Sequence, residues 1–339
     1  MNLNRGINLG GFLSQCVHEE AHYDSFIHEE DLATIASWGL DHVRLPIDYE
    51  VLEDEEGNRK EHGYERVMEV VNWAKKNGLN IILDLHKACG YSFTTTGEEG
   101  MNNLFDSAEL QTRFINLWTS ISKYFKDCDN VAYELLNEVV EMENADKWNS
   151  LVKRTVAAIR EFSPVTTIIY GGIMWNSVSA IKYLEKPADE NVLITFHFYE
   201  PFIFTHQKAH WVDSLDKNKT INYPVNMEYY MNESKLVGYQ ASAILSCKSK
   251  TMGTEFITEM IQDGIDAAEK LGVKLYCGEF GVIDQAPIED SFNWYRDVEE
   301  VFEKFNIGCC AWTYRQMDFG ITDEHYAEYR DRILKLWAR

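Results

Sequence analysis

Short apolar runs alternate with amphipathic stretches along almost the whole chain. The run from Asn80 to His86 is nearly all apolar, as expected of a strand that is covered on both faces. The stretch before it, from Tyr64 to Asn77, repeats its valines at helical spacing and is followed by Gly78, a residue type that commonly ends helices. Strands that alternate with helices in this way predict a parallel sheet whose strands are joined by helical crossovers.

Eight strand patterns follow this rhythm, each with a helix pattern after it. The predicted strands are 6–13, 42–46, 80–86, 131–139, 166–172, 191–199, 274–279 and 307–312. The predicted helices are 28–38, 64–77, 106–121, 147–162, 177–184, 254–271, 290–305 and about 323–337. We expect Asp106 to cap the third helix and Pro46 to end the second strand, because proline cannot donate to a ladder. This is the count of a (β/α)₈ TIM barrel, an α/β fold, and we expect residues 1–339 to form a single domain.

One spacing breaks the rhythm, between the sixth strand and the helix that starts at Thr254. Residues 200–253 are rich in Tyr, Trp, Asn and Lys and are too many for an ordinary strand-to-helix loop. Because they follow the carboxyl end of a strand, we expect a small inserted lid or subdomain at the rim of the barrel's active face. Its aromatic residues either offer stacking surface or form a small core of the insert itself; they include Trp211, Tyr223, Tyr229 and Tyr230.

Composition narrows the choice of partners. The net charge of −23 and the pI near 4.8 argue against nucleic acid and against an anionic membrane surface as partners. Nine Trp, eighteen Tyr and seventeen Phe are more aromatic residues than a core alone needs. Flat aromatic faces suit sugar rings, although many of these residues must belong to the core.

The seven cysteines are scattered and show no CxxC pair or Cys/His metal spacing. We therefore expect reduced thiols, no disulfide framework, no metal site and no cofactor. The chain begins without a charged segment followed by an apolar one, and no apolar run is long enough to cross a bilayer. The expected location is the cytoplasm, or outside the cell after removal of a signal segment, and the expected state is a monomer.

Polar residues at the carboxyl ends of barrel strands line active sites in this fold. Eight such residues fall at the same end of the predicted strands: Arg44, His86, Asn137, Glu138, His197, Tyr199, Glu279 and Trp312. Taken singly, an arginine can serve a structural ion pair, and a histidine or tryptophan can belong to the core. Two glutamates that end strands on opposite sides of a closed sheet face each other across a pocket. Acid/base hydrolysis of a glycosidic bond requires this arrangement.

Four motifs carry a resemblance to a known family: His42-Val-Arg-Leu-Pro46, Leu135-Leu-Asn-Glu-Val139, Phe196-His-Phe-Tyr199 and Leu275-Tyr-Cys-Gly-Glu-Phe-Gly-Val282. The chain resembles glycoside hydrolase family 5, a retaining family with catalytic glutamates on strands four and seven. The stretch from Pro201 to Trp211 is similar to the clostridial cellulase C type within that family. The resemblance spans essentially the whole chain.

The resemblance implies that Glu138 is the general acid/base and Glu279 the nucleophile. It also implies that Asn137 binds the sugar 2-hydroxyl, while Arg44 and Tyr199 hold Glu279 ionised and oriented. An ionised nucleophile needs cations and donors nearby, and its negative charge should raise the pKa of Glu138. A retaining mechanism predicts the two carboxyl groups roughly 5–5.5 Å apart.

The same resemblance implies that His86 and His197 bind the sugar or orient the carboxylates, and that Trp312 forms a stacking floor. Lys87 departs from the pattern, since close relatives often carry a second histidine there. It is either a solvated lysine or an altered contact near the non-reducing side of the cleft. Lys87, with His206 and Trp211 from the insert, is therefore a candidate for remote subsites.

The sequence thus favours a retaining endo-β-1,4-glucanase that acts on cellulose-type or mixed-linkage β-glucan by double displacement. The same chemistry on mannan or glucomannan, or exo-action as a β-glucosidase, stays open. A catalytically silent carbohydrate-binding barrel would not need both glutamates. A phosphate-binding aldolase would need a strand-terminal lysine and a phosphate loop, and neither is evident.

Overall fold

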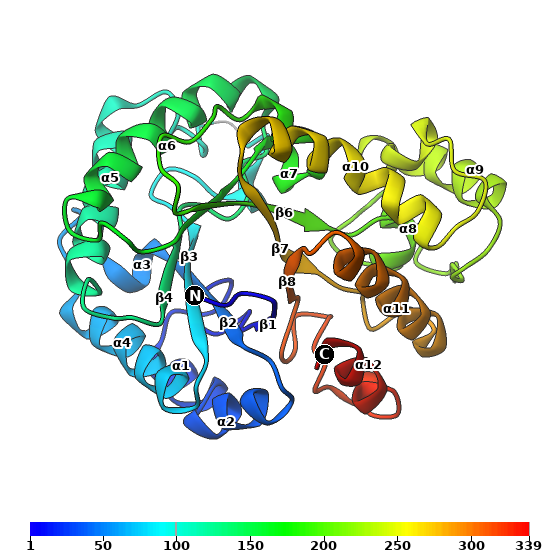
Figure 1. Cartoon of the computed structure of the whole chain (residues 1–339), viewed down its shortest axis with the longest axis horizontal. Helices are drawn as coiled ribbons and strands as arrows, with labels where there is room; N and C mark the ends of the chain where they lie inside the picture. The colour runs from blue at the N-terminus through cyan, green and yellow to red at the C-terminus, as the bar shows by residue number, and fades with distance from the viewer. Residues whose placement is uncertain (99, 339) are drawn as a thin grey trace.

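The computed structural model describes residues 1–98 and 100–338, and within them eight parallel strands close into a barrel in sequence order (Figure 1). The strands are β1 (Arg5–Asn8), β2 (His42–Asp48), β3 (Asn80–Lys87), β4 (Val131–Glu134), β5 (Ile168–Gly171), β6 (Val192–Phe198), β7 (Lys274–Phe280) and β8 (Gly308–Ala311). The barrel closes through pairing of β1 with β8. The predicted (β/α)₈ fold is confirmed.

Helices follow the strands and surround the barrel (Figure 1). The α-helices are α1 (Glu20–Phe26), α2 (Glu29–Ser37), α3 (Tyr49–Leu52), α4 (Glu61–Lys76), α5 (Ala108–Tyr124), α6 (Ala145–Arg160), α7 (Ile173–Asn176), α8 (Phe202–Thr205), α9 (Met227–Val237), α10 (Thr254–Leu271), α11 (Ile288–Lys304) and α12 (Arg330–Trp337). The 3₁₀ helices are η1 (Phe93–Thr95), η2 (Met142–Asn144), η3 (Val178–Tyr183), η4 (Tyr239–Ala241), η5 (Ala243–Ser246) and η6 (Glu324–Tyr326).

The expected end of the second strand at Pro46 is wrong, because β2 continues to Asp48. The carbonyl of Arg44 accepts the N–H of Leu9, and the N–H of Asp48 donates to Leu13. Alternate residues of β2 therefore face the β1 side, and Pro46 falls among them, past the last residue of β1. The ladder to β3 loses no hydrogen bond there, so the proline is tolerated.

Smaller differences affect element ends. Ser107, not Asp106, caps α5: its hydroxyl accepts the N–H of Leu110, whereas Asp106 pairs with Lys147. The predicted helix 177–184 is the 3₁₀ helix η3, and the last helix starts only at Arg330. β4 ends at Glu134, so the predicted Asn-Glu pair lies beyond the regular strand.

Part of the aromatic content is core that supports the active end of the barrel. Four tryptophans are fully buried: Trp118, Trp148, Trp294 and Trp337. The indole N–H of Trp118 on α5 donates to the carbonyl of Leu135 at 3.0 Å, and that of Trp148 on α6 donates to Gly171 at 2.8 Å. Both carbonyls lie at or just after the ends of strands. Buried indoles thus fix the chain where β4 and β5 leave the barrel.

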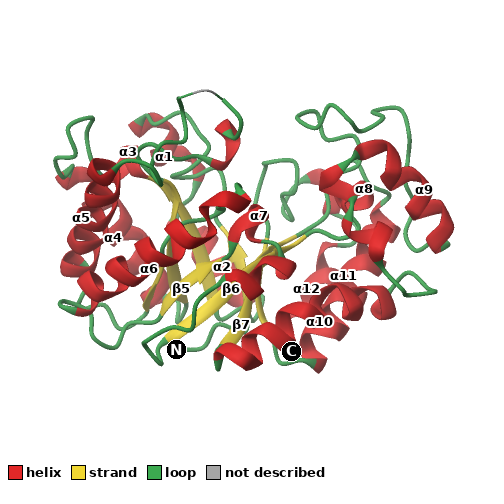
Figure 2. Ribbon diagram, turned by 90° about the horizontal axis from the view of Figure 1, so that it is seen from above, coloured by secondary structure: helices red, strands yellow, loops and turns green. Residues whose placement is uncertain are grey.

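The segment 200–253 contains α8, α9, η4 and η5. In Figure 2, α8 and α9 lie at the same end of the barrel as α1 and α3, away from both chain termini. Tyr223 and Tyr230 are buried, and the Tyr223 hydroxyl donates to Asp297 at 2.9 Å. These two tyrosines form core, whereas Trp211 is 48% exposed. None of the helices in the described residues has the length and apolar character needed to span a membrane.

Candidate active site

Arg44 lies at the centre of a cluster of charged side chains at the carboxyl end of the barrel. It is fully buried, and its Nε and Nη2 atoms donate to the two oxygens of Glu134 at 2.8 and 2.9 Å. Nη1 donates to Glu279 at 2.8 Å, and Nη2 lies 3.0 Å from Asp84. Nη2 also donates to Oδ1 of Asn137 at 2.8 Å. Because a guanidinium presents its donors in a fixed plane, this residue sets the relative positions of four neighbours.

Glu279 lies near the end of β7, with both carboxylate oxygens held. Oε1 accepts from Arg44 at 2.8 Å, and Oε2 accepts from the Tyr199 hydroxyl at 3.0 Å. Burial, and then the charge of Glu279, raise the pKa of Tyr199 well above its ordinary value, so the phenol keeps its proton as a donor. Glu279 thus accepts hydrogen bonds from one charged and one neutral donor.

Glu138 lies opposite, four positions past the last residue of β4. Its Oε1 lies 2.7 Å from Nδ1 of His197. Although 11% of its side chain is exposed, burial raises the pKa of Glu138 to about 7, while His86 and Arg44 act to lower it. The predicted cause of the rise was wrong: burial raises the pKa, and no neighbouring negative charge is among the causes.

The separation of the two carboxylates is short. One oxygen of Glu138, one oxygen of Glu279 and a ring nitrogen of His197 all lie within 4.8 Å of one another. A nucleophile and an acid/base in a retaining glycosidase lie about 5–5.5 Å apart, and the inverting arrangement needs about 6.5–9.5 Å. The observed spacing is of the retaining class.

Two histidines complete the cluster. Burial lowers the pKa of His197 to about 4, so the ring is neutral. Burial, and then the charge of Arg44, also lower the pKa of His86, whose Nδ1 lies 2.7 Å from Asp84. The His86 ring is nearly parallel to that of Trp312, with centroids 5.8 Å apart and planes 8° apart. All eight residues predicted from strand ends therefore lie in one connected group, and their roles stay predictions.

A match to a protein-family model over most of the chain identifies the family. The model of cellulase (glycosyl hydrolase family 5) matches residues 5–318. The chain belongs to glycoside hydrolase family 5. Endoglucanase C of Acetivibrio thermocellus is 37% identical to this family 5 chain over 348 aligned positions, covering 100% of this chain and 99% of the relative. Cellodextrinase A of Ruminococcus flavefaciens is 36% identical, covering 89% of this chain and 83% of its own length.

Solved structures agree with this membership. Thermotoga maritima Cel5A in complex with mannotriose superposes with a TM-score of 0.74 at 27% identity, covering 99% of this chain and 97% of that one. The same enzyme in complex with cellobiose gives the same TM-score of 0.74, identity of 27% and coverage of 99% and 97%. The fold of this family 5 barrel is thus that of T. maritima Cel5A, which has been solved with mannotriose and with cellobiose.

Several residues of this family 5 site were not predicted from the sequence: Asn8, Asp84, Glu134 and Asn176. Asn8 on β1 accepts from Nη1 of Arg44 at 2.9 Å and donates to the carbonyl of Gly278 at 3.0 Å. Asp84 and Glu134 are charged residues inside otherwise apolar strands, and this was the signal that could have found them. Asn176 is the last residue of the short segment α7, and nothing in the local pattern distinguishes it.

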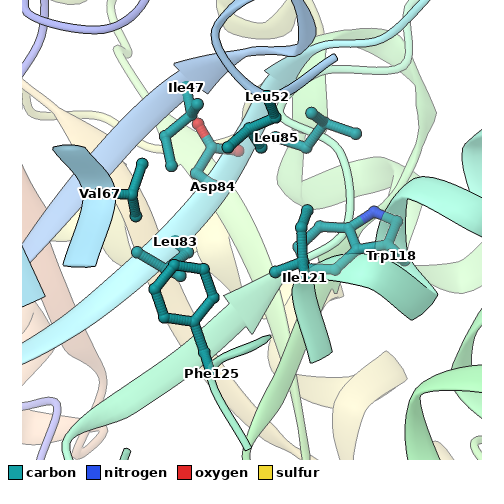
Figure 3. Close-up of a pocket in the computed structure, with 9 residues that line it drawn as sticks. All are labelled: Ile47, Leu52, Val67, Leu83, Asp84, Leu85, Trp118, Ile121 and Phe125. Atoms are coloured by element: carbon teal, nitrogen blue, oxygen red, sulfur yellow. The ribbon is translucent and has the colours of Figure 1, made fainter. Parts of the chain in front are cut away.

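A small cavity of about 10 Å³ lies behind Asp84 (Figure 3). Asp84 is the one charged residue among the nine that line it; the others are apolar or aromatic. Its Oδ1 atom is buried and has no hydrogen-bond partner among the residues that the structure describes. Burial raises the pKa of Asp84 to about 7, against the opposing effect of Arg44. The arginine is thus shared among three buried carboxylates, and at Asp84 the effect of burial outweighs that of the arginine.

Lys87, the departure from the family pattern, pairs with Glu50 and lies 5.5 Å from the ring of Tyr49. Next to this pair, His18 lies 3.2 Å from Asp48. His18, Asp48 and Glu50 are close enough to share a metal ion. Lys87 already supplies a positive charge to Glu50, and His18 to Asp48 when protonated, so the group needs no ion for its charge balance.

On the other side of the site, aromatic rings connect Tyr199 to the insert. The ring centroids of Tyr199 and His206 are 4.9 Å apart, and those of His206 and Trp211 are 6.3 Å apart. Phe319 packs against both His206 and Trp211, at 5.5 and 6.5 Å. The half-exposed Trp211 thus lies at the outer end of a row of rings that begins at Tyr199.

Proposed function

We propose that this chain is a retaining endo-β-1,4-glucanase in which Glu279 is the nucleophile and Glu138 the general acid/base. The observation that carries the proposal is the unequal environment of two neighbouring glutamates. Arg44 and Tyr199 both donate hydrogen bonds to Glu279, whereas burial raises the pKa of Glu138 to about 7. Two nearby carboxyl groups in contrasting environments are the pattern of an acid and a nucleophile.

In the first step, a Glu279 oxygen attacks the anomeric carbon of the sugar and the bond to the leaving oxygen breaks. Glu138 gives its proton to that oxygen, so the departing sugar leaves as a neutral alcohol. The Tyr199 hydroxyl and Arg44 keep the attacking carboxylate in place. Asn137 has its Oδ1 turned to Arg44, which leaves the amide nitrogen as a donor for the 2-hydroxyl of the sugar.

In the second step, Glu138 acts as the base. Once Glu279 is esterified, its negative charge is gone, and Glu138 has already given up its proton. Glu138 then removes a proton from water, the water oxygen attacks the anomeric carbon, and the ester bond to Glu279 breaks. Two inversions at the same carbon leave the product in the β configuration.

The names of the relatives support β-glucan as the substrate. Endoglucanase C aligns over the full chain at 37% identity, and T. maritima Cel5A has been solved with cellobiose. A second candidate is β-mannan, because the same Cel5A has also been solved with mannotriose. We further propose that the protein acts as a monomeric single catalytic domain on neutral polysaccharide.

Three residues outside the central group are proposed to contact sugar rings away from the cleaved bond. Lys87 lies next to His86 on β3 and forms one side. His206 and Trp211 lie in the segment that follows β6 and form the other. An exposed tryptophan at the end of an aromatic row is suited to stack on a sugar face.

The test is the activity of the purified protein on carboxymethyl cellulose, barley β-glucan and galactomannan, with the products sized. We expect oligosaccharides of mixed length from β-glucan, with a β-anomer signal in the NMR spectrum before mutarotation. Release of glucose alone would contradict endo-action. An initial α-anomer would contradict the retaining assignment, and turnover of galactomannan alone would favour the second candidate.

A further inference from the structure

The short segment α7 after β5 contains consecutive residues in the left-handed backbone conformation. Met174, Trp175 and Asn176 have φ of 58°, 55° and 57°. A bulky residue with positive φ is rare and is strained unless its surroundings hold it. Here the N–H groups of Met174 and Trp175 donate to the carbonyls of Val140 and Val139, both at 3.1 Å. This segment is thus bound to the residues that directly follow the proposed acid/base.

The side chain of Asn176 extends this contact to the catalytic group. It is 1% exposed, and its Nδ2 donates to the carbonyl of Asn137 at 2.8 Å. The same Nδ2 lies 3.4 Å from Nε2 of His197. The last residue of β5, Gly171, makes room for this amide: a Cβ there would lie 1.5 Å from Oδ1 of Asn176. Asparagine also tolerates the left-handed backbone better than most residues.

These contacts determine the proton position on His197. The carbonyl of Asn137 can only accept, so the amide atom that faces it must be the nitrogen, which carries hydrogens alone. The second hydrogen of that nitrogen points to Nε2 of His197, which must then be the unprotonated ring atom. The ring is neutral, so its single proton sits on Nδ1, 2.7 Å from Oε1 of Glu138.

We propose that Asn176 is a positioning residue: it keeps the proton of His197 on Nδ1, which donates to Oε1 of Glu138 and leaves Oε2 to carry the catalytic proton. The inference rests on the proposed role of Glu138 as the acid. With the opposite tautomer, Nδ1 would accept a hydrogen bond, and the proton of Glu138 would be drawn to Oε1, toward the histidine. Glu138 would then hold its proton away from the leaving oxygen. Asn176 thus acts on proton delivery without contact to the sugar.

The ring proton can be observed directly by ¹⁵N NMR of the full-length protein labelled in histidine, near neutral pH. The His197 signals are assigned by their loss in His197→Gln. We expect a neutral ring with the proton on Nδ1. Asn176→Asp, nearly identical in shape, places an acceptor at Nε2, so we expect the proton to move to Nε2 or the ring to become doubly protonated. A wild-type ring protonated on Nε2 would overturn the inference, whether or not any Asn176 variant folds.

Kinetics on aryl β-cellobiosides provide a second readout. Asn176→Asp and Asn176→Gly should lower kcat/KM about tenfold or more on phenyl cellobioside, a fraction of the full effect of general acid catalysis. They should lower it much less on 2,4-dinitrophenyl cellobioside, whose leaving group needs no proton. Glycine adopts the left-handed backbone but lacks the side-chain amide. Asn176→Gly therefore separates the effect of the side chain from that of the backbone conformation. Equal losses on both substrates would mean a merely structural role and contradict the inference.

Two controls distinguish a failure of this inference from a failure of the proposed function. Asn306 is an exposed asparagine with the same left-handed conformation, φ 53°, between α11 and β8. Asn306→Gly and Asn306→Asp should leave both substrates at wild-type rates. Glu138→Ala should show a strong dependence on the leaving group. If the rates of Glu138→Ala do not depend on the leaving group, the acid assignment of Glu138 fails. If they do, but the rates of the Asn176 variants do not, only the inference on Asn176 fails.

Discussion

Glu279 and Glu138 are the same residue type, with carboxylate oxygens within 4.8 Å of each other, yet they are held in contrasting ways. Glu279 belongs to a regular strand, and its carboxylate receives hydrogen bonds from a buried arginine and a tyrosine. Glu138 lies beyond the end of β4, on a segment held by hydrogen bonds from α7, and its carboxyl faces a neutral histidine. The two glutamates therefore differ in environment and not in residue type, and on this difference the two proposed roles depend.

The charges around each glutamate follow the same division. The guanidinium of Arg44 forms an ion pair with Glu279, the proposed nucleophile. On the Glu138 side, burial dominates and the pKa rises to about 7. Because Glu279 lies in a regular strand and Glu138 beyond the end of one, we expect the two residues to respond differently to substitution.

Glu279→Gln should reduce turnover of every substrate to below about 1% of the wild-type rate, because an amide cannot form the glycosyl-enzyme. The loss should be the same for good and poor leaving groups. Steady-state rates on β-glucan and on 2,4-dinitrophenyl cellobioside provide the measurement. A variant that keeps more than a few per cent of the rate on either substrate would remove Glu279 from the nucleophile role.

Glu138→Ala should instead discriminate between substrates. Loss of general acid catalysis should cost about 10²- to 10⁴-fold on poor leaving groups and far less in the glycosylation of 2,4-dinitrophenyl cellobioside. In the wild-type enzyme, the acid must be protonated for the first step, so kcat/KM on a poor leaving group should fall as pH rises through about 7. The same descending limb should be absent in Glu138→Ala. A limb that persists there belongs to another group and contradicts the assignment.

Arg44→Met should destabilise the fold by about 3–5 kcal/mol, because it removes the cation shared by three buried carboxylates. Burial raises the pKa of Asp84 and of Glu134 against the opposing effect of Arg44, so without Arg44 the folded pKa of both should rise further above the unfolded value. The variant should then be closer to wild type at pH 5 than at pH 8, since protonation relieves the uncompensated charge.

Denaturant unfolding at the two pH values measures this effect. The exposed pair of Arg59 and Glu61 gives a matched control, and Arg59→Met should cost at most about 1 kcal/mol. An Arg44→Met variant as stable as wild type at pH 8 would contradict the prediction that Arg44 compensates the charge of these three buried carboxylates.

Trp211→Ala should have the smallest effect and one that depends on chain length. Trp211 lies at the outer end of the aromatic row, so it can contact only substrates long enough to reach it. We expect kcat/KM to fall about tenfold on cellohexaose, on the scale of one lost stacking contact, and little on an aryl cellobioside. Equal losses on both, in a variant with unchanged melting temperature, would leave Trp211 without a subsite role.

The sequence was sufficient for the fold and for the eight residues at strand ends, because each side chain follows from strand order and the rule that sites lie at carboxyl ends. It could not show how Arg44 divides its donors. Asp84 and Glu134 are visible as charges in apolar strands, but only the register of β2, β3 and β4 brings them to the same guanidinium. Asn176 was out of reach, because its place depends on a left-handed turn and on Gly171 leaving space for the amide.

The pKa of Glu138 shows another limit of sequence reasoning. A neighbouring carboxylate is visible as a motif, so the sequence attributed the raised pKa to its charge. Burial depends on how loops from several strands close over the end of β4, and it is burial that raises the pKa. Tertiary packing thus supplied a cause that no local pattern contains.

Trapping of the glycosyl-enzyme tests the division of roles most directly. The full-length protein is incubated with 2,4-dinitrophenyl 2-deoxy-2-fluoro-β-cellobioside, which forms the intermediate faster than water removes it. Peptic peptides are then analysed by mass spectrometry. We predict a single added fluorocellobiosyl group on the peptide that contains Glu279, and no label in Glu279→Gln. A label on the Glu138 peptide, or turnover with no covalent adduct, would contradict the account.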